Sequence, residues 1–376
     1  MTRTIEDLIP DYLRGLPVYV PGKPIEEVER ELKIHAIKLA SNENPLGPSP
    51  MAMEALRRVA GESHRYPDGG THLLRRKLAE LCGVTPEEIF VALGSSELID
   101  LASRLLLRPG VQGLTSEGSY VPFSIAIRAS GAELVTVPQL EFAFDLEAMA
   151  KAITAKTGVI YLANPNNPTG TAFTAEKLGK FLEAVPDGVL VVLDEAYIHY
   201  AVSVERHGTE EAYRKRKNLL ILRTFSKVYG LAGLRIGYAI GQPELLAAMT
   251  KLKTPFNTSG VAQAAALAAL DDHAHVKRCI EANALERKRL SAGLSKLGLR
   301  PVQSEANFVF IPVGPEAKAI SDDLLHLGVI VRPLGWMGFP EAIRISIGTA
   351  EENDKCLEAL GRVLGKKAGK SEMAAR

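Results

Sequence analysis

The sequence predicts an α/β fold with a mostly parallel sheet in a large domain and a smaller α/β domain at the C-terminal end. Short apolar runs of strand type alternate with helical stretches from residue 89 to about residue 255. This alternation is typical of a parallel sheet covered by helices on both faces. Polar motifs follow directly after several of the runs, at the strand ends where open α/β sheets bind ligands. Beyond residue 255 an alanine-rich helix precedes a second, shorter set of strands and helices.

Composition sets the broad class of the protein. The chain has 376 residues, of which 46% are hydrophobic and 24% charged, which suits a globular protein with a large core and two domains. A net charge of +1 gives no support to binding of nucleic acid or of an anionic membrane. No apolar segment approaches the length of a membrane span. Cys82, Cys279 and Cys356 show neither CxxC nor zinc spacing, so we expect reduced thiols, no metal and a cytoplasmic location.

Residues 1–45 are expected to form an arm that packs on the small domain. Prolines favour an extended segment at 18–24, and an amphipathic helix follows at 25–32. A brief strand is expected at 37–40. The loop 41–48, which is dense in turn-forming residues, leads into the large domain.

The large domain is expected over residues 46–255 and the small domain over residues 256–376. The strands expected in the large domain are 89–93, 113–115, 133–137, 158–163, 189–193, 219–223 and 235–240. Its expected helices are 50–60, 73–82, 123–130, 146–153, 175–184, 211–215 and 243–253, with one more that follows 94–97 and runs to 107. The small domain is expected to hold a long helix from 259 to 297 that is broken near 271–272, strands at 307–311, 329–331 and 343–347, and helices at 316–327 and 351–364.

The stretch 218–241 carries the strongest chemical signal. Lys227 follows a strand-type run and precedes a glycine-rich bend. A lysine amine in partly apolar surroundings has a lowered pKa and can form a Schiff base. Thr224, Ser226 and Arg235 could hold a phosphate beside it. A single lysine after a strand is usually a solvated surface residue, so this interpretation depends on the spacing of the whole stretch.

Three further motifs follow strands. Ser95 and Ser96 stand between a strand and a helix, where backbone N–H groups bind anions, although an ordinary helix N-cap would explain them too. Tyr120 follows a polar turn and could stack on a planar ring, or pack as a half-buried side chain. Asn167 lies in the NPNNPTG loop, which two prolines stiffen, and could donate to a ring hydroxyl.

A carboxylate ends another apolar run. Asp194 follows residues 189–193, and a charged group at the end of a buried strand is costly unless it is paired. A protonated pyridine nitrogen would be a fitting partner, and Tyr197 could reach a ring hydroxyl. A helix N-cap is the alternative role for Asp194.

Together these motifs resemble the fold-type I pyridoxal-phosphate aminotransferases, and among them the histidinol-phosphate aminotransferases. The resemblance extends over nearly the whole chain. Its segments are KLASNENPLGPSP (38–50), RYPDGG (65–70), ANPNNPTG (163–170), DEAY (194–197), SKVYGLAGLRIGY (226–238), VIVRPL (329–334) and IRISIGT (343–349). It implies a large domain with a seven-stranded, mostly parallel sheet.

The resemblance also implies a role for each matching residue. Lys227 would carry pyridoxal 5'-phosphate as a Schiff base and move the α-proton, and Asp194 would pair with the pyridine nitrogen. The implied contacts to the ring come from Asn167, Tyr197 and Tyr120, and those to the phosphate from Ser95, Ser96, Thr224, Ser226 and Arg235. Many relatives carry Asn or Asp where this chain has Ser96, which leaves the contact of Ser96 open.

The implied substrates are L-histidinol phosphate and 2-oxoglutarate, which would give imidazole acetol phosphate and L-glutamate by a ping-pong reaction. Arg344 would bind the carboxylate of the amino donor, and Tyr19, Asn44, Arg332 and Arg344 would meet the phosphorylated half-substrate. Tyr66 would reach the cofactor phosphate of a partner subunit, which implies a homodimer with shared sites.

Three alternatives remain open from the sequence. The bulky loop 335–340 between the two arginines could favour an aromatic side chain, which keeps an aromatic amino-acid aminotransferase open. A pyridoxal-phosphate decarboxylase of phosphorylated amino acids would use the same cofactor site. A non-catalytic regulator built on this domain is disfavoured by Lys227 and Asp194, and by the lack of an appended DNA-binding module.

Overall fold

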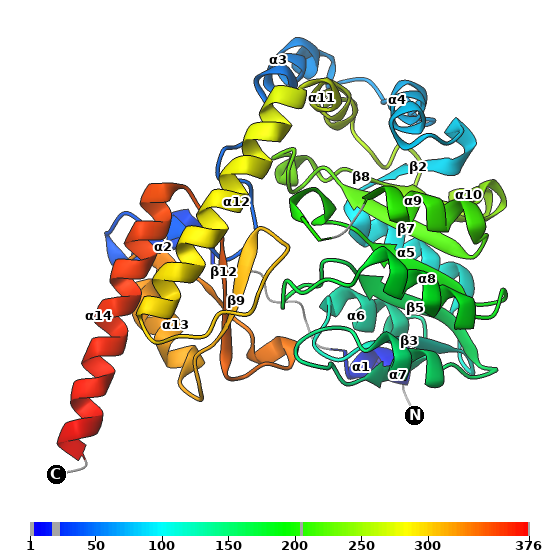
Figure 1. The fold of residues 1–376 in the computed structure, drawn as a ribbon. Helices are drawn as coiled ribbons and strands as arrows, with labels where there is room; N and C mark the ends of the chain where they lie inside the picture. The colour runs from blue at the N-terminus through cyan, green and yellow to red at the C-terminus, as the bar shows by residue number, and fades with distance from the viewer. Residues whose placement is uncertain (1–3, 17–22, 204–205, 375–376) are drawn as a thin grey trace.

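The computed structural model describes residues 4–16, 23–203 and 206–374. Its largest sheet has seven strands in the order β2-β8-β7-β6-β5-β3-β4 (Figure 1). In chain order these are β2 (Ile89–Ala92), β3 (Gln112–Ser116), β4 (Glu133–Val137), β5 (Thr157–Ala163), β6 (Leu190–Asp194), β7 (Leu219–Thr224) and β8 (Gly237–Ile240). Only β8 runs antiparallel to its neighbours, so the prediction of a mostly parallel seven-stranded sheet is confirmed.

Helices pack around this sheet and explain why its central strands are apolar throughout. All residues of β6 and β7 are buried, as expected where both faces of a parallel sheet are covered. The helices of this part of the chain are α3 (Pro50–Val59), α4 (His72–Cys82), α5 (Gly94–Leu106), α6 (Val121–Ala129), α7 (Leu146–Lys151), α8 (Ala175–Ala184), α9 (Arg206–Lys215), α10 (Pro243–Thr250) and α11 (Gly260–Asp271). Side-chain caps fix several starts, such as Ser49 for α3 and Thr174 for α8.

The C-terminal part forms a second α/β unit with its own small sheets. Strands β9 (Phe308–Pro312), β12 (Ala342–Ser346) and β11 (Arg332–Pro333) form an antiparallel sheet, in the order β11-β12-β9. A separate parallel pair joins β10 (Val329–Ile330) to β1 (Ile37–Lys38). The sequence indicated a single strand at 329–331, whereas two short strands, β10 and β11, lie on either side of Val331 and pair with different strands.

The N-terminal residues contact both units. Helix α1 (Asp11–Arg14) lies against α6 of the large unit. Helix α2 (Ile25–Leu32) lies with the small unit, where Val28 packs with Ile330. Ile37 and Leu39 continue into the apolar core of that unit. Part of the expected arm therefore packs on the small unit, whereas its first helix packs on the large one.

Helix α12 (His273–Lys296) connects the two units (Figure 1). The break expected near residues 271–272 is present, since α11 ends at Asp271 and Asp272 caps α12 by accepting from His275 N–H. The buried residues of α11 belong to the core of the seven-stranded sheet. We therefore propose that the boundary between the units lies near Asp272 rather than near residue 255.

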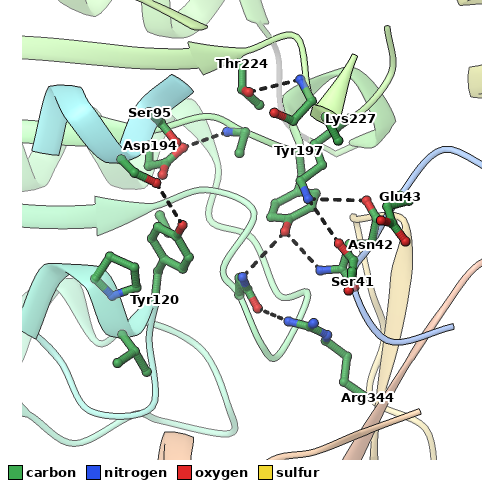
Figure 2. A pocket seen from close by; sticks show the side chains of 18 of the residues that line it. Ser41, Asn42, Glu43, Ser95, Tyr120, Asp194, Tyr197, Thr224, Lys227 and Arg344 are labelled. Atoms are coloured by element: carbon green, nitrogen blue, oxygen red, sulfur yellow. Dashed lines mark hydrogen bonds between the residues drawn. The ribbon is translucent and has the colours of Figure 1, made fainter. Parts of the chain in front are cut away.

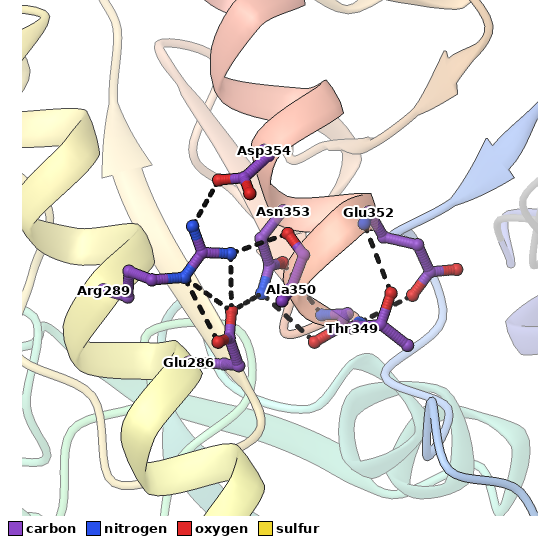
Figure 3. Close-up of polar contacts among 8 residues, drawn as sticks. Glu286, Arg289, Thr349, Ala350, Glu352, Asn353 and Asp354 are labelled. Atoms are coloured by element: carbon purple, nitrogen blue, oxygen red, sulfur yellow. Dashed lines mark hydrogen bonds and ion pairs between the residues drawn. The ribbon is translucent and has the colours of Figure 1, made fainter.

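The far end of α12 is tied to α14 (Ala350–Ala374) by a polar network, while α13 (Ala317–His326) packs beside them. Glu286 accepts from Arg289 Nη2 at 2.8 Å and from Asn353 Nδ2 at 2.8 Å (Figure 3). Asn353 also exchanges hydrogen bonds with the backbone of Gly348, which follows β12. This network fixes the chain leaving β12, the strand that carries Arg344.

Two further observations concern the cysteines and the possibility of a membrane-spanning helix. Cys82, Cys279 and Cys356 are all buried. Within residues 4–16, 23–203 and 206–374, no helix is long and apolar enough to cross a membrane.

Candidate active site

A cavity of about 260 Å³ lies between the carboxyl ends of the central strands and the small unit. Strands β5, β6 and β7 deliver residues to it from one side, and β11 and β12 from the other. The predicted site residues that line it are Ser95, Ser96, Tyr120, Asn167, Asp194, Tyr197, Thr224, Ser226, Lys227, Arg235, Arg332 and Arg344. The sequence motifs, which are far apart along the chain, therefore meet in one place.

One end of the cavity has the chemistry of an anion site. The N-terminus of α5 presents Ser95 and Ser96, and Arg235 Nη1 lies 3.5 Å from Ser226 Oγ. A Cβ atom on Gly94 would lie 3.1 Å from Arg235 Nη2, so glycine lets the guanidinium approach the start of the helix. Helix N-terminal N–H groups, hydroxyls and a guanidinium are the groups that bind phosphate. This donor set fits the phosphate of pyridoxal phosphate.

Lys227 projects into the middle of the cavity (Figure 2). Its Nζ lies 3.3 Å from the carbonyl oxygen of Asn42 and 3.5 Å from that of Ser41. The same nitrogen stands 5.3 Å from the centre of the Tyr197 ring. Lys227 follows β7 directly, so the sheet fixes its backbone while the loop at 41–42 holds its amine.

Asp194 ends β6 and is only 4% exposed. Burial raises the pKa of its carboxyl to about 7, although a hydrogen bond from Ala196 N–H and the charge of Lys227 oppose the shift. It does not cap a described helix, since the short 3-10 helix that follows (Ile198–Tyr200) has Tyr197 at its N-cap. A buried carboxylate in this position needs a cationic partner, which a protonated ring nitrogen would supply.

Tyr197 and the two amides beside it form the centre of the polar contacts. The Tyr197 hydroxyl oxygen accepts from Asn42 Nδ2 at 3.0 Å and from Asn167 Nδ2 at 3.5 Å. Tyr120 is half-buried, and its hydroxyl lies 3.5 Å from Ser96 Oγ. Its ring packs edge-on against Phe123, which is fully buried and fixes the position of Tyr120.

Two arginines occupy the wall opposite the anion site. Arg332 and Arg344 are directly paired across β11 and β12, and both are buried. Arg344 donates to Asn167 Oδ1 and, at 2.8 Å, to the carbonyl of Ala40. The Arg332 guanidinium lies 4.7 Å from the centre of the Trp336 ring. The cavity thus offers a second anion-binding region, formed by the small unit.

Two expected site residues, Asn44 and Tyr66, do not line this cavity. Asn44 turns away, and its Nδ2 donates to Val228 O at 2.8 Å and lies 3.2 Å from Cys279 Sγ. Tyr66 is 83% exposed and stacks on Phe256. Tyr19 lies outside the described residues.

The sequence reasoning missed Asn42. Its side chain, not that of Asn44, reaches the cavity, because Asn42 adopts a left-handed conformation with φ of 56°. Asparagine tolerates that conformation better than most residues, which is the one signal that the loop offered. Trp336 and Met337 also line the cavity, from the loop whose bulk the sequence had already indicated.

The family of the chain follows from comparison with known proteins. The family model described as "Aminotransferase class I and II" matches residues 34–360. The chain belongs to the class I and II aminotransferases. This family is pyridoxal-phosphate dependent, and the lysine, aspartate and phosphate-binding groups described above are the ones expected of it.

Curated relatives are similar over almost the whole chain. A histidinol-phosphate aminotransferase from Anaeromyxobacter sp. strain Fw109-5 is 47% identical over 364 residues, which cover 95% of this chain and 99% of the relative. Histidinol-phosphate aminotransferase 2 of Pseudomonas aeruginosa is 46% identical, with 94% and 96% covered.

Solved structures of aminotransferases are similar in fold. A histidinol-phosphate aminotransferase from Sinorhizobium meliloti in complex with pyridoxal-5'-phosphate has a TM-score of 0.88 and 33% identity, and covers 95% of this chain and 98% of its own. An aspartate aminotransferase from Thermus thermophilus with maleate has a TM-score of 0.81 and 26% identity, with 94% and 99% covered. Because proteins named for different substrates share this fold, the fold alone does not select the substrate.

Proposed function

We propose that this aminotransferase moves the amino group between L-histidinol phosphate and 2-oxoglutarate. The observation that carries the proposal is the second anion-binding region, formed by Arg332 and Arg344. Histidinol phosphate has no carboxylate, so its phosphate has to provide the anionic group that the enzyme binds. Glutamate would use its carboxylates in the same region. The names of the similar relatives support the same substrate.

Pyridoxal phosphate, when bound, supplies a charged ring that withdraws electrons from the substrate's α-carbon. Ser95, Ser96, Thr224, Ser226 and Arg235 would hold its phosphate, and Asp194 would keep the proton on its ring nitrogen. Tyr120 would stack on the ring.

Within the same proposal, Lys227 would remove the proton from the α-carbon of the amino donor. In the second half-reaction it would deliver a proton to the α-carbon that receives the amino group. The amine already lies inside the cavity, held by two backbone carbonyls. Asn167 and Tyr197 would contact the ring hydroxyl, since both face the space beside Lys227. The small unit would cover the substrate and exclude water, because the two arginines come from its strands.

Arg332→Ala tests the substrate. We expect kcat/KM for histidinol phosphate to fall about 10–10²-fold, because charged hydrogen bonds contribute roughly 1.5–3 kcal/mol each. The loss with phenylalanine should be smaller, because Arg344 would still bind the carboxylate. Arg332→Lys keeps the charge but loses the planar guanidinium group. Its kcat/KM for histidinol phosphate should lie between those of the wild type and Arg332→Ala.

Steady-state kinetics on a panel of histidinol phosphate, histidinol, phenylalanine and tyrosine measures this, with the exposed Arg300→Ala as control. If an aromatic amino acid were the better substrate, and Arg332→Ala left that ranking unchanged, an aromatic amino-acid aminotransferase would replace our proposal. Conversion of the bound cofactor to its amine form by glutamate would distinguish either transaminase from a decarboxylase.

We also propose a homodimer in which Tyr66 reaches the partner's cofactor phosphate. Tyr66 is 83% exposed and does not line the cavity of its own subunit. Nearby, Met51, Leu73 and Phe256 are exposed apolar side chains, and a groove bounded by α3, α4 and α11 includes Met51 and Leu73. Exposed apolar surface of this kind often marks a protein interface.

Mixing two inactive variants tests the shared site. Tyr66→Ala and Lys227→Ala subunits, combined after mild denaturation and refolding, should regain up to about one quarter of wild-type activity, because each hybrid dimer contains one intact site. Each variant refolded alone is the control. A fully active monomer in sedimentation velocity would contradict the proposal.

A further inference from the structure

A chain of hydrogen bonds runs from β12 in the small unit to Tyr197 in the large unit, through Asn42. The backbone N–H of Asn42 donates to Ser346 Oγ at 2.8 Å, and Ser346 Oγ donates to Asn42 Oδ1 at 3.0 Å. Asn42 Nδ2 then donates to the Tyr197 hydroxyl oxygen at 3.0 Å. All three side chains are at most 5% exposed, so water does not compete freely for these contacts.

Ser346 determines which way the Asn42 amide faces. The serine oxygen already accepts the Asn42 backbone N–H, so its own proton is available for the amide oxygen. The opposite orientation would place two N–H donors on Ser346 Oγ and deprive the serine proton of the amide oxygen as acceptor. Buried donors left unpaired are costly, so the orientation with Nδ2 toward Tyr197 is favoured.

Arg344 fixes the second amide in the same sense. Asn167 Oδ1 accepts from Arg344 Nη1, and a guanidinium can only donate. The Nδ2 group of Asn167 must then face the other way, toward the Tyr197 hydroxyl oxygen at 3.5 Å. Tyr197 thus receives N–H donors from two amides whose orientations are set independently by residues of β12.

A tyrosine hydroxyl has one proton to donate and two lone pairs that accept. With Asn42 and Asn167 on its acceptor positions, the proton of Tyr197 has to point elsewhere. We propose that Asn42 is a positioning residue that turns the Tyr197 proton into the cavity, toward the ring-hydroxyl oxygen of the cofactor. This inference rests on the proposed cofactor site. In this arrangement Tyr197 can only donate to the ring-hydroxyl oxygen, and its hydrogen bond stabilises the deprotonated form of that oxygen.

Asn42 also contacts the catalytic lysine. Its carbonyl oxygen accepts from Lys227 Nζ at 3.3 Å and from Asn307 Nδ2 at 3.0 Å. A single residue therefore places both the amine that would bind the cofactor and the phenol that would act on its ring oxygen. Through its hydrogen bonds with Ser346 and Asn307, Asn42 connects Lys227 and Tyr197 to the small unit, which also carries the two arginines.

Asn42→Asp tests this role. The change preserves shape, tolerates the left-handed backbone and keeps the acceptor for Ser346, but it replaces the donor to Tyr197 with an acceptor. Tyr197 would then donate to residue 42 instead of the cofactor. The pKa of the lysine-bound cofactor, read from its visible absorbance against pH, should rise by about one unit or more. Ser346→Ala, which frees the amide to turn, should give a smaller rise.

A new negative charge near the cofactor would also raise this pKa, so the same change is made in a Tyr197→Phe background. There Asn42→Asp should raise the pKa less than in the wild-type background, because the hydroxyl that it redirects is gone and only the effect of the charge remains. An equal rise in both backgrounds overturns the proposal. So does an Asn42→Asp or Ser346→Ala protein that folds and leaves the pKa of the lysine-bound cofactor at the wild-type value. If wild-type protein forms no borohydride-reducible link to pyridoxal phosphate, the cofactor site itself is wrong.

Discussion

Lys227→Ala is expected to abolish the borohydride-reducible link to pyridoxal phosphate and to lower turnover by several orders of magnitude. Proton transfer by a positioned side chain alone typically contributes ~10²–10⁴-fold, and loss of the covalent attachment adds to this. Lys227 is the one lysine among the described residues that line the cavity, so no other lining amine can take its place. Single-turnover kinetics with glutamate, together with mass spectrometry of reduced protein, measures both effects.

A matched control comes from Lys77, whose side chain is partly buried and pairs with Asp271 outside the cavity. Lys77→Ala should keep the cofactor link and near-normal turnover, apart from a small change in stability. Near-normal activity in Lys227→Ala would show that the amine is not catalytic, and would leave the Ser226-Lys227 motif as a structural feature only.

The strands and the residues at their ends could be predicted from the sequence because their signals are local. Val191, Val192 and Leu193 are apolar since both faces of the sheet are covered, and Asp194 contrasts with them. Lys227 is likewise identified by its immediate neighbours. Parallel topology then brings the ends of adjacent strands to the same edge, so their convergence follows without knowledge of any side-chain contact.

The loop that carries Asn42 and Asn44 could not be interpreted in this way. Which of the two asparagines faces the cavity depends on a positive φ at residue 42 and on Ser346, which is 304 positions away in the sequence. The boundary of the large unit is also a long-range matter. Helix α11 packs on α3 and α4, with its buried residues in the core of the large unit, and its alanine-rich sequence does not identify these partners.

Asp194 offers the clearest separation of a functional from a structural role, because its burial has opposite consequences with and without cofactor. Its pKa is raised from 3.8 to about 7, chiefly by burial. Between these two pH values the unfolded chain has lost this proton while the folded chain still holds it. Stability of the cofactor-free protein should therefore fall as pH rises from about 4 to about 7. A protonated ring nitrogen would reverse this by pairing with the carboxylate.

Asp194→Asn is therefore expected to remove catalysis without harming the fold. The amide oxygen can still accept from Ala196 N–H, which preserves the local turn. We expect kcat to fall about 10²–10³-fold, the range found when one preorganised electrostatic partner is removed, because the ring nitrogen would no longer stay protonated. Some pyridoxal phosphate should still bind through Lys227.

Thermal unfolding of the cofactor-free proteins at pH 5 and pH 8 completes the test. The variant should lose less stability than the wild type between these two values, since it has no buried carboxyl to ionise. With cofactor bound, the wild type should be the more stable of the two proteins at pH 8, because only Asp194 can pair with the charged ring. A variant that stays active, or that unfolds more readily without cofactor at pH 8, would show that Asp194 serves the fold and not the chemistry.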